Sequence, residues 1–361
     1  MLRCHILSAL FVIALSGCST LPEAEPDPAL AAPVAKQSAA ADEPPETPIP
    51  EDNLLPLLQA EFALRARDYN QAVALLTEQA TLLTDPALAR RALRLAEFVT
   101  DAERAAAMAV RLVELDPEDG AAQAAASGWL SRTGRPVAAL EFAGNAYELG
   151  HPVNIATTLG NYEQMDDDSK AAIAEALHDL AARWPDDNEI AIASSLLARL
   201  EQDWRRAESF LLPVLERSPE DVRAIMLWTQ LQLDQAVPNP LQRLEDAVAA
   251  FPANQELRLQ YARLLGSEGD YTGAREQFAL LLEVDPTNPE LLSTAALLDF
   301  ELEFFDAAQL KFEQLIALGE RPDEAHYYIG RIEMSRDRYP EAIESFAQVG
   351  PSREFRDAKA R

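Results

Sequence analysis

The side chains that could perform acid–base or metal chemistry are few in this sequence and stand apart from one another. The four histidines are His5, His151, His178 and His326. A zinc site needs ligands at set spacings, such as two histidines four residues apart on one helix face. None of these histidines has such a partner, and His326 falls at a position where a large packing residue is expected.

A run of three aspartates, Asp166-Asp167-Asp168, is the remaining candidate for cation binding. It lacks the alternating spacing and the glycine of a calcium loop, so we expect a solvated turn that caps the start of a helix. The sequence also contains no nucleophile elbow, no phosphate-binding loop and no glycine-rich dinucleotide turn. We therefore expect no catalytic residues, no metal site and no enzyme activity.

One residue is placed for covalent chemistry at a membrane. The apolar run from Ile6 to Leu15 is too short to span a bilayer core, which needs roughly 20 residues, and it fits the apolar part of an export signal. Leu15-Ser16-Gly17-Cys18 then resembles the bacterial lipobox, at which the signal is cleaved before a cysteine that becomes lipidated through a thioether. The resemblance implies a signal peptide over residues 1–17 and a lipid on Cys18. An ordinary signal peptide that contains a cysteine is the alternative.

The lipobox also implies where the mature protein resides. Three acyl chains on Cys18 would anchor it stably without a membrane span, and no cofactor other than this lipid is expected. Ser19 replaces the aspartate that holds many such lipoproteins at the inner membrane, which favours the periplasmic face of the outer membrane. Because Cys4 leaves with the signal, the mature chain has no disulfide.

Composition excludes one class of partner and predicts a tether. The chain has 60 acidic and 31 basic residues, a formal net charge of −29, so nucleic acid is not an expected partner. Residues 18–52 are rich in proline and alanine after the cysteine, and we expect them to form a disordered linker. A flexible chain of this length has an r.m.s. span on the order of 30 Å.

Residues 53–361 repeat with a period near 34. Small and aromatic residues recur at this spacing and would let two helices of a hairpin approach closely, with an aromatic side chain filling the gap to the next hairpin. These positions are Ala262, Ala296 and Gly330; Ala274, Ala308 and Ala342; and Phe278, Phe312 and Phe346. The pattern resembles the tetratricopeptide repeat, which implies an all-α superhelical solenoid of about nine hairpins.

Two units and the C-terminus depart from the pattern. The fourth unit has Asn161 and Ile173 where small residues belong, and the sixth has Trp228 and Pro240. We expect a degenerate fourth unit, and a distorted hairpin or a lengthened turn in the sixth. The segment 352–361 is either a polar capping helix or the start of another repeat.

The surface of the first helices is the candidate binding site. Stacked hairpins form an extended concave face lined by first-helix residues. Apolar, aromatic and arginine side chains gathered there are typical of an interaction surface, although burial against a neighbouring helix is the alternative for each of them. The candidates in the last three units are Leu259, Arg263, Leu297, Phe300, Tyr327, Arg331 and Met334.

A second resemblance suggests the partner. The lipobox, the linker and the repeats, together with the segments 60–69 and 85–92, resemble the LbcA-type outer-membrane lipoproteins. These bind a periplasmic carboxyl-terminal processing protease and present substrates to it, including cell-wall hydrolases. The resemblance implies a scaffold that raises the effective concentration of its partners. The alternative is an assembly or pilotin-like lipoprotein for a pilus, a secretin or another envelope complex.

Overall fold

The computed structural model describes residues 49–350 of the chain. From Glu51 onward these residues form one compact unit. The predicted signal peptide, Cys18, nearly all of the predicted linker and the segment 352–361 lie outside the described residues.

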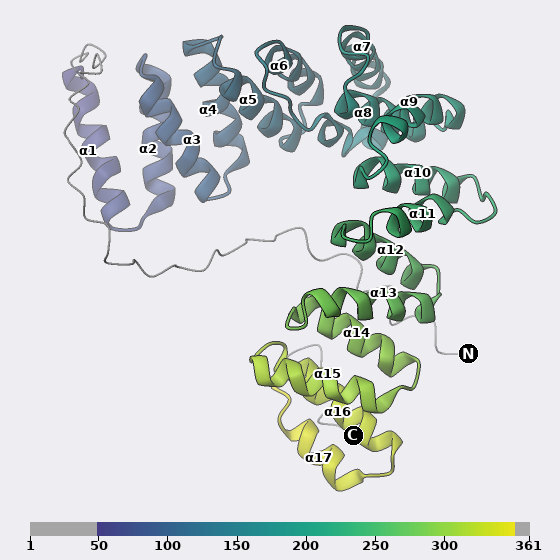
Figure 1. The fold of residues 1–361 in the computed structure, drawn as a ribbon. Helices are drawn as coiled ribbons and strands as arrows, with labels where there is room; N and C mark the ends of the chain where they lie inside the picture. The colour runs from purple at the N-terminus through teal and green to yellow at the C-terminus, as the bar shows by residue number, and fades with distance from the viewer. Residues whose placement is uncertain (1–48, 351–361) are drawn as a thin grey trace, which may run out of the picture. The chain divides into compact units, whose positions relative to one another are not determined.

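The described residues are all-α, which confirms the predicted fold class (Figure 1). Helices follow one another as antiparallel hairpins, and each hairpin packs against the next along the chain. The first helices of the hairpins are α1 (Glu51–Arg65), α3 (Pro86–Phe98), α5 (Gly120–Arg132), α8 (Asn188–Leu200), α10 (Val222–Asp234), α12 (Gln255–Ser267), α14 (Pro289–Glu301) and α16 (Pro322–Ser335). The second helices are α2 (Tyr69–Leu82), α4 (Ala102–Leu115), α6 (Pro136–Glu148), α7 (Asp167–Arg183), α9 (Trp204–Arg217), α11 (Gln242–Ala250), α13 (Tyr271–Val284), α15 (Phe305–Leu318) and α17 (Tyr339–Ala347).

Capping side chains determine where many of the helices begin. A side-chain oxygen at the helix start accepts a hydrogen bond from a backbone N–H of the first turn, which stabilises a helix by about 1 kcal/mol. These caps recur at the repeat period at the starts of four consecutive first helices, at Asp187, Asp221, Asn254 and Asn288. Part of the acidic excess of the chain is therefore used in helix starts.

The turns inside the hairpins share one backbone conformation. The connection contains a residue with positive φ, a region that glycine occupies without steric cost. Gly269 has this role between α12 and α13 with φ of 88°, whereas Gln202 (61°) and Glu303 (63°) adopt it without being glycine. The tight turn brings the two helices together antiparallel.

Small residues at the predicted positions allow close packing of the helices. Ala262, Ala296 and Ala308 are completely buried. A Cβ atom added to Gly330 would lie 2.6 Å from Cε1 of Phe346, on the facing helix of the same hairpin. The repeating core of the solenoid therefore consists of alanine or glycine against a large side chain.

The fourth and sixth units depart from the regular hairpin, as the sequence predicts. In the fourth unit, two short 3-10 turns, η2 (Ile155–Leu159) and η3 (Tyr162–Gln164), replace the first helix before α7. In the sixth, the connection between α10 and α11 is lengthened to residues 235–241, and α11 has only 9 residues. The prediction for Trp228 was wrong: Thr229, eight residues after the cap of α10 as Ala262 is in α12, occupies the small position and is completely buried. Trp228 lies beside it and packs under the guanidinium of Arg243, whose Cζ lies 4.7 Å from the ring centroid.

None of the helices within residues 49–350 combines the length and the apolar character that a membrane crossing requires.

Candidate partner-binding surface

Three of the predicted surface residues come together between α14 and α16. The guanidinium carbon of Arg331 lies 4.6 Å from the ring centroid of Phe300 and 5.9 Å from that of Tyr327. Tyr328, which was not among the predicted residues, is a third ring at 5.6 Å. Contacts of a guanidinium with aromatic faces are each worth about 0.5–2 kcal/mol, depending on desolvation. We call Phe300, Tyr327, Tyr328 and Arg331 the aromatic–arginine cluster.

Packing against the buried core fixes the position of the cluster. Tyr328 stacks on the buried ring of Phe312 from α15, with centroids 5.2 Å apart and ring planes within 4° of each other. Burial raises the pKa of Tyr328 to about 12, so its hydroxyl remains protonated and can donate a hydrogen bond. Arg331 makes no ion pair within residues 49–350. Its charge is therefore balanced by ring faces and solvent, and its N–H groups can still bind a partner.

An ionic network lies at the N-terminal ends of the same two helices. Arg321, just before α16, pairs with Glu290 of α14 at 2.5 Å and with Glu324 at 3.3 Å. Ser293 lies 3.3 Å from both carboxylate oxygens of Glu324. The charged side chains beside the aromatic–arginine cluster are thus already in ion pairs. Arg331, in contrast, makes none within residues 49–350.

The other predicted residues lie on the expected helices but outside the cluster. Leu259 of α12 packs against the hydrophobic core around Phe278, and Arg263 of the same helix is exposed. Leu297 packs with the core around Phe312, and Met334 with that around Phe346. All of them except Arg263 are half-buried. Their participation in binding stays a prediction.

Sequence reasoning missed a second surface, on α1. Its large apolar side chains Leu54, Leu55, Leu58 and Phe62 are 45–64 % exposed, and at 100° per residue they fall within one stripe of the helix. We call them the α1 apolar stripe. Their spacing along one side of a helix is the sequence signal that could have revealed this surface.

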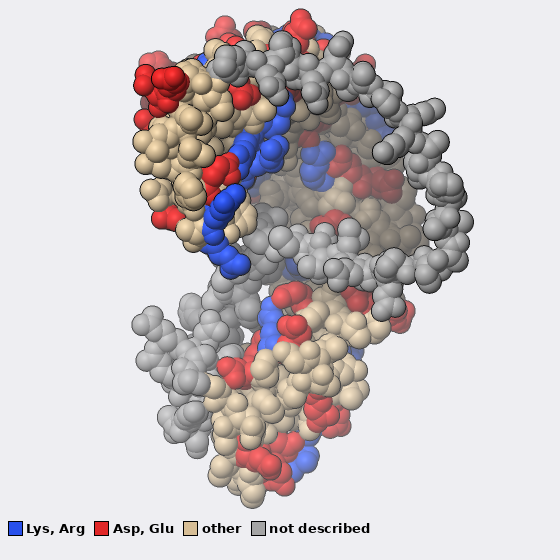
Figure 2. All heavy atoms as spheres, turned by 90° about the vertical axis from the view of Figure 1, so that its left-hand side faces the viewer, with Lys and Arg blue, Asp and Glu red and all other residues tan. Residues whose placement is uncertain are grey.

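Two arginines of α3 lie next to α1. They line a groove of about 320 Å³ formed by α1, α2 and α3, whose lining residues are Leu64, Leu76, Arg91, Arg94, Leu95 and Phe98. Arg91 pairs with Glu61 of α1, and a hydrogen bond from this guanidinium lowers the pKa of that carboxyl. Figure 2, which looks onto the α1 side, shows a stripe of basic side chains on a surface of mainly uncharged residues with scattered acidic ones.

The groups considered for catalysis do not assemble into a site. Within residues 49–350, no cluster of three or more His, Asp, Glu or Cys side chains could hold a metal ion. Asp166 caps α7 as expected, accepting a hydrogen bond from the backbone N–H of Ser169 at 2.7 Å, and this bond lowers its pKa. His326 is half-buried, and His178 lines a pocket between helices.

Comparison with known proteins identifies the repeat. The tetratricopeptide-repeat family model matches residues 227–298, from within α10 to α14. A curated relative, the TPR repeat-containing protein PA4667 of Pseudomonas aeruginosa, is 27 % identical over 317 residues, which are 86 % of this chain and 53 % of the relative. The chain therefore spans about half the length of this relative.

Solved structures with similar helical arrays include three proteins of different origin. MamA is 17 % identical, with 48 % of this chain and 93 % of that chain covered, at a TM-score of 0.37. Yeast Tom70 is 14 % identical, with 82 % and 75 % covered, at 0.33. PilW, described as a type IV pilus biogenesis factor, is 12 % identical, with 58 % and 98 % covered, at 0.35. The period of the hairpins and their packing are those of a tetratricopeptide-type solenoid fold, and residues 227–298 match the model of that repeat family.

Proposed function

We propose that the protein is a periplasmic adaptor anchored to the outer membrane through a lipid on Cys18. Its partners would be a carboxyl-terminal processing protease and the cell-wall hydrolases that this protease degrades. The repeat fold supports a role in protein binding. The lipobox and the likeness to LbcA-type lipoproteins support the location and the partners. The adaptor would bring its partners together and would not itself catalyse a reaction.

The α1 apolar stripe is the observation that carries the protein-binding role. Phe62 is two residues after the small residue of its helix, as are Leu298 in α14 and Ile332 in α16. In those later units, where a preceding hairpin covers this face, Leu298 is 6 % exposed and Ile332 is 0 % exposed, whereas Phe62 is 64 % exposed. Phe62 thus lies on the face that is covered by packing in those later units.

The occupant expected on this face is an amphipathic helix of the protease partner. Such a helix would occupy the place that the second helix of a preceding hairpin has in later units. Its apolar residues would contact Leu55, Leu58 and Phe62, and acidic residues beside them would meet Arg94, which makes no ion pair within the described part of the chain. Grooves and stripes that accept helices through such apolar anchors are a recurring mode of recognition.

Two separate surfaces let one chain bind two partners. The α1 apolar stripe and the aromatic–arginine cluster belong to different units, the first and the last two. With the protease on α1 and a substrate on the cluster, tethering would raise the local concentration of substrate without new catalytic groups. This division of roles is part of the proposal.

Affinity capture from detergent-solubilised envelope tests the proposal. Tagged full-length protein should recover a periplasmic serine protease of the carboxyl-terminal processing class. Phe62→Glu places a charge in the stripe and should reduce this recovery by about tenfold or more, since about 1.4 kcal/mol corresponds to tenfold. Leu310→Glu is the matched control, because Leu310 of α15 is also exposed, at 58 %, but lies outside both surfaces.

Two results would refute the proposal. Recovery of pilus or secretin subunits alone would favour the assembly role instead. Equal recovery of the protease by Phe62→Glu and by Leu310→Glu would place its binding site away from α1. Unchanged helical circular dichroism of both variants is required for the comparison.

A further inference from the structure

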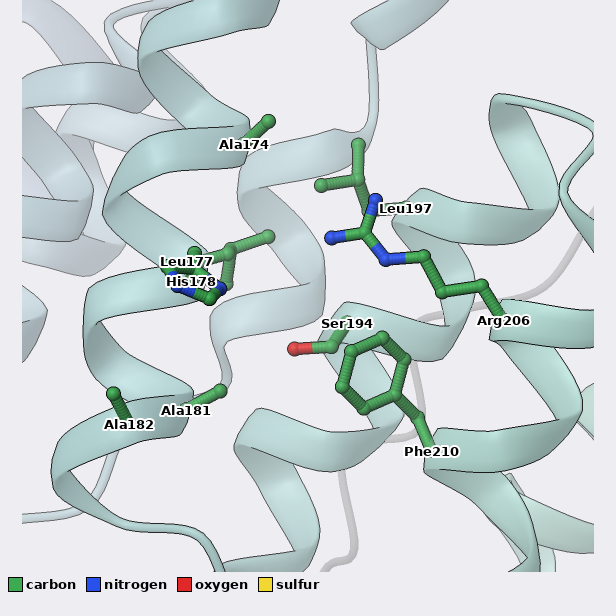
Figure 3. Close-up of a pocket in the computed structure, with 9 residues that line it drawn as sticks. All are labelled: Ala174, Leu177, His178, Ala181, Ala182, Ser194, Leu197, Arg206 and Phe210. Atoms are coloured by element: carbon green, nitrogen blue, oxygen red, sulfur yellow. The ribbon is translucent and has the colours of Figure 1, made fainter.

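A pocket opens between two second helices in the middle of the solenoid. It lies between α7 and α9 with α8 as its floor, and its volume is about 390 Å³ (Figure 3). Leu177 and His178 of α7 form one side, and Arg206 and Phe210 of α9 form the other. Neither the α1 apolar stripe nor the aromatic–arginine cluster contributes to it.

A small residue of α8 borders the pocket. Ser194 precedes the small position of α8, and the residues at this place in the later units are Trp228, Tyr261, Ala295 and Ile329. Ala295 and Ile329 are buried, and Trp228 and Tyr261 are half-buried, so three of the four later units have a large side chain at this place. Beside Leu177 and His178, α7 contributes only the small side chains of Ala174, Ala181 and Ala182 to the lining.

The hydroxyl of Ser194 has no partner. The residue is 6 % exposed, and its Oγ makes no hydrogen bond within residues 49–350. The next residue, Ser195, is also buried but donates a hydrogen bond to the carbonyl of Ala207 at 2.9 Å. In Figure 3 the Ser194 Oγ points into the space beside Phe210. A buried hydroxyl is destabilising unless something hydrogen-bonds to it, so the site is built for an incoming polar atom.

The rim supplies a cation and an aromatic wall. The Arg206 guanidinium lies 5.8 Å from the Phe210 ring centroid, and its ion pair with Glu201 is long, at 3.6 Å. No acidic residue lines the pocket, whose walls are otherwise aliphatic, as at Leu177 and Leu197. A ring placed here would have apolar contacts on its sides and a guanidinium near its face.

We propose that this pocket receives a tyrosine side chain projecting from a partner protein. The phenol ring would take the place that the side chain of Trp228 or Tyr261 has in other units, and its hydroxyl would hydrogen-bond to the Ser194 Oγ as the Phe210 ring moves aside. A carboxylate fits less well, because Arg206 already faces Glu201 and the chain has a net charge of −29. The inference concerns a different site from the proposed protease-binding face and stands whether or not that proposal holds.

Small probes test the pocket on the purified full-length protein. The probes are N-acetyl-tyrosinamide, N-acetyl-phenylalaninamide and N-acetyl-glutamic acid amide, titrated while the methyl NMR signals of Leu177 and Leu197 are followed. The tyrosine probe should shift these signals and bind about fivefold or more tightly than the phenylalanine probe, as one added hydrogen bond predicts. The glutamate probe should bind more weakly than both.

Variants of the pocket make the test specific. Ser194→Leu places a large aliphatic side chain at this position, as Ile329 does in α16, fills the cavity and should abolish binding of all three probes while leaving the thermal midpoint equal or higher. Ser194→Ala should bring the tyrosine and phenylalanine probes to equal affinity. Arg206→Gln should weaken both aromatic probes, whereas Arg205→Gln, which removes a neighbouring charge outside the pocket, should not.

Three outcomes would overturn the inference. These are no binding of the tyrosine probe, tightest binding of the glutamate probe, and binding that persists in Ser194→Leu. Capture of a partner that is lost in Ser194→Leu and retained in Phe62→Glu would separate this site from the α1 apolar stripe.

Discussion

At the scale of single residues, hairpin packing depends on side-chain volume at a few positions. Gly330 lies against Phe346, where even a methyl group would come within 2.6 Å of the ring. Gly128, in α5, has no atom within 4 Å of where its Cβ would be. Both glycines lie inside helices, but only Gly330 is required by a neighbouring side chain. Substitutions at the two positions therefore distinguish the effect of packing from the effect of helix propensity.

Alanine substitutions at the two glycines should therefore have opposite effects. Gly330→Ala overpacks the last hairpin and should lower the free energy of unfolding by about 1–3 kcal/mol. Gly128→Ala adds helix propensity in open space and should raise it by about 0.5–1 kcal/mol. Urea unfolding followed by circular dichroism measures both. Stabilisation by Gly330→Ala would contradict the close packing of α16 on α17.

At the scale of helices and hairpins, the sequence predicts the repeating hairpins but not the pocket at Ser194. The small residues Ala262, Ala296 and Gly330 predict the hairpins because close helix packing requires them at each period. The irregular side chains Asn161 and Pro240 also predict which units depart from the pattern. The pocket at Ser194 was not predictable in the same way, because it depends on side chains of α7 and α9 that meet only in the folded chain.

The aromatic–arginine cluster was also only partly predictable from the sequence. Phe300, Tyr327 and Arg331 were predicted from their places in the repeat, and packing brings them together. Tyr328 escaped prediction because it is a core position of its helix, stacked on Phe312, that also contacts Arg331. A periodic pattern assigns a residue to one face only, whereas a long aromatic side chain can contact two.

The sixth hairpin should be the least protected element of the solenoid. Its second helix, α11, has only 9 residues and follows the lengthened connection at residues 235–241. Amides of residues 235–250 should exchange with deuterium faster than those of α12 and α13, since local opening exposes few buried contacts. Hydrogen exchange with mass spectrometry measures this, and equal protection of α11 and α13 would show that the irregular hairpin is as stable as a regular one.

At the scale of the whole molecule, the chain combines a formal net charge of −29 with apolar side chains on α1 that are exposed within residues 49–350. A large net charge disfavours association between copies of one protein. A lipid on Cys18 would hold the proposed binding surfaces near the membrane, where envelope proteins meet. We propose that the protein brings a protease and its substrate together, and such a scaffold changes the rate of proteolysis in a characteristic way.

Reconstituted proteolysis measures this effect on the rate most directly. The protease recovered by capture is mixed with a cell-wall hydrolase substrate and increasing amounts of the full-length protein. A scaffold with separate sites predicts that the rate rises, passes through a maximum and falls again when excess scaffold binds the two partners on different copies. Phe62→Glu should flatten the curve, and the protein alone should leave the substrate intact. A rate that rises to a plateau without falling, or cleavage without the protease, would contradict the adaptor account.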